Sequence, residues 1–193
     1  MQWLFEMDFR VFMFLNRSLA NPVFDWLMPF ITNKDNFMIP IILTALALAV
    51  FGGKKGRIAV LLGVMTVILS DQLSSAVIKP LVQRIRPSHP DHLIEGARYL
   101  IGTKGSWSFT SSHAANNASA ALFFSVKYPK VKWVLIVIAL MVGYSRIYVG
   151  VHWPLDVIGG YLVGIICAGA VLLSEKGVRY FWIKRRQRPE NGA

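Results

Sequence analysis

The sequence predicts an all-α, polytopic membrane helical bundle with five to six transmembrane helices, preceded by amphipathic N-terminal interfacial helices. Three observations predict this class. Hydrophobic residues make up 54% of the 193 residues and charged residues only 16%, which is too little charge to cover the surface of a soluble domain. The charges gather between apolar runs that approach the roughly 20 residues needed to cross a bilayer core. No strand-like alternation of apolar and polar residues competes with these runs.

Residues 1–35 are expected to form two amphipathic helices that lie in the membrane interface. Their apolar residues are interrupted by Glu6, Asp8 and Arg10, and Asn21-Pro22 separates the two segments. Helices that are rich in aromatic residues and dotted with charges commonly lie in this interface. A short membrane span remains an alternative for one of them. The same charges argue against a cleavable signal peptide.

Five stretches are predicted to be transmembrane helices within a membrane domain at 36–175. Each is close to the length that the bilayer core requires, and helices satisfy their own backbone hydrogen bonds in lipid. Residues 176–193 are predicted to form a basic cytoplasmic tail. The five stretches are 37–53, 57–79, 111–128, 131–150 and 155–174.

The basic residues predict the orientation of the bundle. Lysine and arginine gather between the first two spans, between the third and fourth, and in the tail, and these places share one side, which the positive-inside rule makes cytoplasmic. The loop 80–110 and the turn 151–154 then face outward. Because the loop 80–110 is also basic, against the rule, we expect an anionic ligand there. The net charge of +11 does not favour a nucleic-acid partner, since much of it flanks apolar segments.

Three segments carry the polar residues that chemistry would need: 79–87, 111–113 and 145–156. Two predicted spans separate the second segment from the third, and two crossings return the chain to the same face of the membrane. All three segments are therefore expected at the outer ends of helices, where they can form a single site.

A phosphate ester would suit such a site because its negative charge must be met by several fixed donors around one phosphorus. Lys79, Arg86 and Arg146 supply cations, and arginine can bind phosphate through two parallel hydrogen bonds. Ser111 and the backbone N–H groups near Ser112 can complete the phosphate cradle at a helix N-terminus, where the helix dipole favours an anion.

Two histidines fit the roles of nucleophile and acid. His152 and Asp156 are four residues apart, so on a helical turn the carboxylate lies beside the ring and can hold one nitrogen as N–H while the other attacks. His113 would protonate the departing oxygen. Each group alone has a structural explanation: Lys79 or Arg86 as an interfacial anchor, His113 as a helix cap, and His152 with Asp156 as a structural pair. The joint pattern favours the catalytic interpretation.

These residues resemble the type 2 phosphatidic acid phosphatase family, which shares its site with the vanadium haloperoxidases. The family signature comprises Lys-x6-Arg-Pro, then Pro-Ser-Gly-His, then Ser-Arg-x5-His-x3-Asp. The second segment departs from it, since Thr110 replaces proline and Ser112 replaces glycine, which has more backbone freedom. The matching residues are Lys79, Arg86, Pro87, Ser111, His113, Ser145, Arg146, His152 and Asp156.

The resemblance implies a helical bundle with a phosphohistidine intermediate on His152, His113 as general acid, and no metal or other cofactor. The sequence is similar to those of the small bacterial members of this family, which act on lipid phosphates at the outer, periplasmic face of the inner membrane and need no obligate protein partner. The substrates that the resemblance implies are undecaprenyl diphosphate, phosphatidylglycerophosphate or the 1-phosphate of lipid A. Two rivals stay open: a phosphotransferase that uses the same site, and a non-catalytic lipid-binding or transport protein.

Other polar or small residues have weaker interpretations. Asp71 lies inside the second span, where it either supports Lys79 or makes an interior hydrogen bond. Gly160 and Gly164 are spaced for close helix packing. The remaining candidates are interhelical hydrogen bonds from Asn116 and Asn117, a head-group contact or plain solvation for His89, His92 and Arg98, and simple burial for Cys167.

Overall fold

The computed structural model of the protein describes residues 2–186, and within this range all regular secondary structure is helical. This confirms the predicted all-α class. The elements in chain order are α1 (Gln2–Met13), η1 (Phe14–Ser18), α2 (Pro22–Thr32), α3 (Asp35–Phe51), α4 (Gly53–Gln72), η2 (Leu73–Ile78), α5 (Lys79–Val82), α6 (Ser112–Lys127), η3 (Pro129–Val131), α7 (Lys132–Tyr148) and α8 (Pro154–Arg186).

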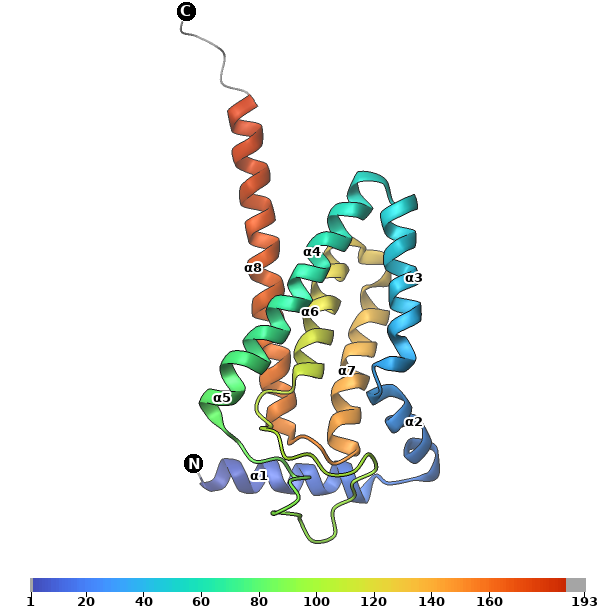
Figure 1. Ribbon diagram of the computed structural model, residues 1–193, viewed down its shortest axis with the longest axis vertical. Helices are drawn as coiled ribbons and strands as arrows, with labels where there is room; N and C mark the ends of the chain where they lie inside the picture. Colours follow the sequence, from blue (N-terminus) through green and yellow to red (C-terminus); the bar gives the residue numbers. More distant parts are fainter. Residues whose placement is uncertain (1, 187–193) are drawn as a thin grey trace, which may run out of the picture.

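Helix α6 lies at the centre of the bundle and packs against α4, α7 and α8 (Figure 1). Its sequence is rich in alanine and serine, whose small side chains let neighbouring backbones come close. A Cβ atom at Gly160 of α8 would collide with the carbonyl oxygen of Ser111, and one at Gly164 would collide with that of Ala115. The predicted close packing at this glycine pair is confirmed.

The described helices make this a membrane protein. Three helical runs are long and apolar enough to cross a bilayer: Gly53–Val82, Pro129–Tyr148 and Pro154–Arg185. Helices α2 and α3, bent by 53° at their junction, would add a fourth span if the pair crosses as one. Each of the five predicted stretches coincides with a helix, but α6 has only 16 residues. The count of five to six spans stays a prediction.

The two ends of the bundle differ in character. At one end lie α1, the coil between α5 and α6, and the turn between α7 and α8 (Figure 1); Arg86 of the coil donates to the carbonyl oxygen of Val151 in the turn at 2.8 Å. Away from this end, Lys55 lies over the ring of Tyr128, at 5.0 Å, and Lys127 forms an ion pair with Glu175. The segments expected to share a face therefore do so.

The first and last helices, α1 and α8, show features that the sequence did not predict. Helix α1 lies across the end of the bundle (Figure 1) and buries Phe12 in a cluster with Ala114, Ile147 and Val157. Helix α8 passes without a break through position 176, the predicted start of the tail, and ends at Arg186. The first part of the predicted tail is thus helical, and its last residues, 187–193, lie outside the described residues.

Candidate active site

A buried histidine–carboxylate pair lies where the turn after α7 enters α8. His152 is 2% exposed and Asp156 is fully buried. Nδ1 of His152 lies 3.3 Å from Oδ2 of Asp156, and the backbone N–H of Trp153 donates to the same oxygen at 2.9 Å. Pro154 opens α8, so Asp156 sits in the first helical turn, where the dipole stabilises a carboxylate. A proton on Nδ1 leaves the lone pair of Nε2 free to react.

Arg86 faces that second ring nitrogen. Its Nη1 lies 2.9 Å from Nε2 of His152, and its Nε donates to the carbonyl oxygen of Ser106 at 2.7 Å. The side chain is buried, so its orientation is fixed by these bonds and by the bond to Val151 described above. Because a guanidinium can only donate, Nε2 accepts, which agrees with a proton on Nδ1.

The surroundings keep the ring of His152 neutral. Burial lowers its pKa well below the ordinary histidine value, and the positive charges of Arg86, Arg146 and Lys79 lower the pKa further. A neutral imidazole is the form that can act as a nucleophile at neutral pH.

Arg146, in the last turn of α7, is a buried cation with spare hydrogen-bonding capacity. It is 3% exposed, and its Nη1 donates to Oγ1 of Thr32 at 2.5 Å. Its Nε is buried and has no hydrogen-bond partner among residues 2–186. A buried charged donor without a partner is costly, so this guanidinium is suited to receive an anion.

Lys79 is held by a cluster of hydroxyl groups. Its Nζ donates to Oγ of Ser112 at 2.9 Å. That hydroxyl lies 3.1 Å from Oγ of Ser74 and 3.0 Å from Oγ of Ser75, and Ser74 lies 2.9 Å from Oγ1 of Thr110. The two positions that depart from the family signature, Thr110 and Ser112, therefore belong to one network that orients the lysine.

Ser111 ties the start of α6 to the start of α8. Its hydroxyl caps α6 by accepting from the backbone N–H of Ala114 at 3.5 Å. Its own backbone N–H donates to the carbonyl oxygen of Asp156 at 2.9 Å. In this structure the hydroxyl oxygen and the backbone N–H of Ser111 are both engaged locally, so the part of Ser111 in binding phosphate stays a prediction.

His113 lies in the first turn of α6 and is partly buried. It interacts electrostatically with Arg146, Lys104 and Lys79, and it acts on His152 in the same way. Among the described residues, none forms a hydrogen bond with its ring. The two histidines thus share one cationic environment, as the spacing of the sequence segments predicts.

Sequence reasoning missed two charged residues beside this pair. Nη1 of Arg84 donates to Oδ1 of Asp156 at 2.9 Å, and Nη2 forms an ion pair with Asp8 of α1. The sequence did contain a signal for this contact: Asp8 lies in an apolar helix, and a carboxylate buried there requires a hydrogen-bonding or charged partner. For Asp71 the structure favours the interior alternative, since its carboxylate accepts from Asn116 at 2.9 Å.

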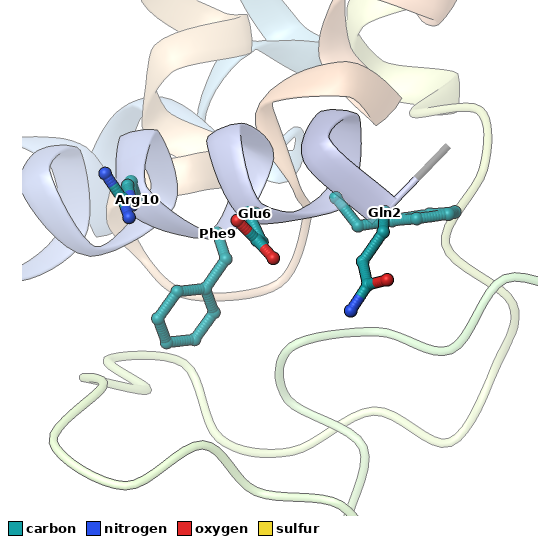
Figure 2. Close-up of a pocket in the computed structure, with 5 residues that line it drawn as sticks. Gln2, Glu6, Phe9 and Arg10 are labelled. Atoms are coloured by element: carbon teal, nitrogen blue, oxygen red, sulfur yellow. The ribbon is translucent and has the colours of Figure 1, made fainter.

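A separate hollow lies on α1, and neither histidine lines it. It has a volume of about 380 Å³ and is lined by Gln2, Phe5, Glu6, Phe9 and Arg10. Figure 2 shows Gln2 and Phe9 pointing from the helix toward the neighbouring coil. Within residues 2–186, three or more histidine, cysteine or acidic side chains do not converge on any point where they could hold a metal ion.

Comparison with known proteins identifies the family. The family model of the PAP2 superfamily matches residues 59–179, more than half of the chain. The chain belongs to the PAP2 superfamily. This confirms the resemblance drawn from the three signature segments, all of which lie in the matched range.

Relatives that match over most of the chain are named as phosphatases, which classes the chain as a membrane phosphatase. It is 29% identical to the lipid A 4'-phosphatase of Bacteroides thetaiotaomicron over 84% of this chain and 74% of that one. It is 33% identical to the lipid A 4'-phosphatase of Porphyromonas gingivalis over 86% of this chain and 72% of that one. The crystal structure of LpxE from Aquifex aeolicus matches with a TM-score of 0.70 and 26% identity, covering 85% of this chain and 93% of LpxE.

Proposed function

We propose that this protein removes a phosphate from a lipid head group through a phosphohistidine intermediate on His152. The observation that carries the proposal is the buried, neutral His152 held by Asp156 and surrounded by Lys79, Arg86 and Arg146. A neutral nucleophile among three cations suits an electrophile that is itself an anion.

In the first step, Nε2 of His152 attacks phosphorus as the bond from phosphorus to the leaving oxygen breaks. The phosphate oxygens take the hydrogen bond that Arg86 now gives to Nε2, which frees the lone pair. Arg146 receives the phosphoryl group at its unpartnered Nε, and Lys79, at the start of α5, neutralises negative charge on the phosphoryl oxygens. His113 gives its proton to the leaving oxygen, which departs as the lipid alcohol or lipid phosphate.

In the second step, a water molecule attacks the phosphohistidine. His113, now neutral, takes a proton from this water, and the phosphorus–nitrogen bond breaks, returning the electron pair to Nε2. Inorganic phosphate leaves and both histidines recover their starting states. Throughout, Asp156 balances the positive charge that develops on the ring of His152.

The substrate is proposed to be a lipid phosphate or diphosphate that reaches the site from the outer leaflet of a bacterial inner membrane. The orientation rests on the positive-inside rule. The apolar windows of the three long runs are only 28% to 39% buried, so most of their surface is free to face acyl chains. Given the relatives named above, phosphates of lipid A take first place in a substrate panel, followed by undecaprenyl diphosphate and phosphatidylglycerophosphate.

The test is phosphate release by purified protein in detergent micelles, measured across that panel. We expect His152→Ala to abolish release and His113→Ala to slow it severely. His92→Ala, an exposed histidine in the coil, is the matched control and should retain wild-type activity. Activity of His152→Ala equal to that of the wild type would refute the mechanism.

The same panel separates the two rivals. A phosphotransferase would yield a phosphorylated acceptor lipid instead of free phosphate, and thin-layer chromatography distinguishes the two products. A lipid-binding or transport protein would release phosphate from no member of the panel. The phosphohistidine can be sought directly by running the reaction with a radiolabelled substrate and then quenching it. The wild type should retain acid-labile label on the protein, and His152→Ala should retain none.

A further inference from the structure

Helix α1 turns one carboxylate toward the active site although the rest of the helix is largely exposed. Asp8 is 4% exposed, whereas Met7 and Phe9 beside it are exposed. Its neighbour on the buried face is Phe12, which is fully buried. Glu6 lies on the exposed face and lines the hollow of Figure 2. The two acidic residues of α1 therefore have opposite environments.

Both oxygens of Asp8 are bonded to groups next to the histidine–carboxylate pair. Oδ1 accepts from the backbone N–H of Leu155 at 2.8 Å, so a residue of α1 caps the N-terminus of α8, where the dipole favours negative charge. Oδ2 forms the ion pair with Arg84. Helix α1 is thus attached to the helical turn that carries Asp156.

Arg84 is fixed between two carboxylates. One terminal nitrogen binds Asp8 and the other binds Asp156, at 2.9 Å. Its guanidinium lies 5.7 Å from the ring centroid of Phe5 and 5.2 Å from that of Trp153, which holds its plane in place. A continuous line of contacts therefore runs from Asp8 through Arg84 and Asp156 to His152.

The charges along this line explain why a second carboxylate is useful. An arginine paired with Asp156 alone would cancel the negative charge that the ring of His152 needs when it becomes positive. Asp8 supplies a second negative charge, so the three groups together keep a net charge of −1, and Asp156 retains its effect on the histidine. Asp8 also prevents Arg84 from turning away from its position.

We propose that Asp8 of α1 is a positioning residue for the reaction, acting through Arg84 to hold Asp156 in the orientation and charge state that His152 requires. This inference rests on the proposed phosphohistidine mechanism. It gives α1 a part in the chemical step beyond its contact with the surface of the bundle.

The test compares Asp8→Asn with Glu6→Gln, which makes the same loss of charge on the exposed face of the same helix. Asparagine can still accept from Leu155 but cannot pair with Arg84. We expect kcat of Asp8→Asn to fall about tenfold, the effect of one hydrogen bond to a charged group, while KM stays within about twofold because the phosphate ligands are untouched. Glu6→Gln should match the wild type.

Variants of Arg84 provide a second test of the same inference. Arg84→Lys keeps the charge but has one nitrogen that cannot bridge both carboxylates, and we expect a similar loss of kcat. In an Arg84→Gln background, Asp8→Asn should have no further effect on kcat, because its influence passes through the arginine. Arg84→Lys alone decides the matter if Asp8→Asn does not fold, which the elution of Asp8→Asn from a sizing column would reveal.

The outcomes separate this inference from the proposed function. If the wild type releases no phosphate from any lipid of the panel, the proposed function fails. If the wild type is active and His152→Ala is not, then wild-type kcat in Asp8→Asn or Arg84→Lys overturns the role of Asp8 alone. A rise in KM with unchanged kcat, or an equal effect of Asp8→Asn in both backgrounds, overturns it as well.

Discussion

Replacing Asp156 with asparagine tests the charge that supports His152. The substitution keeps the shape of the side chain but removes the negative charge 3.3 Å from Nδ1. Two opposite charges about 4 Å apart interact by about 4 kcal/mol at an effective dielectric constant of about 20. In the transition state His152 becomes positive, so losing this interaction should lower kcat by about 10³-fold.

The assay is steady-state release of phosphate from the best lipid of the panel, with KM measured alongside. KM should change little, because Asp156 does not contact the phosphate. Asp91→Asn, an exposed carboxylate in the coil, is the matched control, and thermal melting in detergent checks folding. A loss of kcat below about tenfold in a folded variant would refute the electrostatic reasoning, since one ordinary hydrogen bond accounts for that much.

Three further predictions concern other parts of the site. Ser112→Gly restores the glycine of the family signature but removes the hydroxyl bonded to Lys79 at 2.9 Å. We expect kcat/KM to fall about fivefold, the value of one hydrogen bond, and an increase would contradict the role given to the hydroxyl cluster. Because burial lowers the pKa of His152, its ring should stay neutral as the pH falls from about 7.5 to about 6. The measurement is ¹⁵N NMR of histidine-labelled protein, with His152→Ala to assign the signal. Protonation of the ring within that pH range would contradict the prediction. Gly160→Val should destabilise the protein by about 1–3 kcal/mol, because its side chain would meet the carbonyl oxygen of Ser111; an unchanged melting temperature in detergent would show that α6 and α8 can separate at little cost.

The sequence predicted the helical bundle and the meeting of the three signature segments because both follow from local rules. Apolar runs of bilayer length indicate helices, and counting crossings assigns segments to faces. The bonds between Arg86 and Val151 and between Ser111 and Asp156 show that these segments come together. Individual roles of the site residues remain predictions.

The contacts that the sequence did not predict are those between distant elements whose relative positions depend on packing. Asp8 and Arg84 are 76 residues apart, and no spacing rule links an interfacial helix to a coil. The partner of Arg146, Thr32, is 114 residues away. In both cases the sequence shows that a charge in an apolar setting needs a partner, but only the packed bundle identifies which one.

The length of α8 determines how far it projects from the membrane. Its 33 residues rise about 1.5 Å each, or about 50 Å in total, whereas the hydrocarbon core is about 30 Å thick. If α8 begins at one edge of the hydrocarbon core and runs along the bilayer normal, about 20 Å of the helix extends beyond the acyl chains at its other end. A fluorescent protein fused after this helix would therefore be held away from the lipid surface, at a distance set by a rigid spacer.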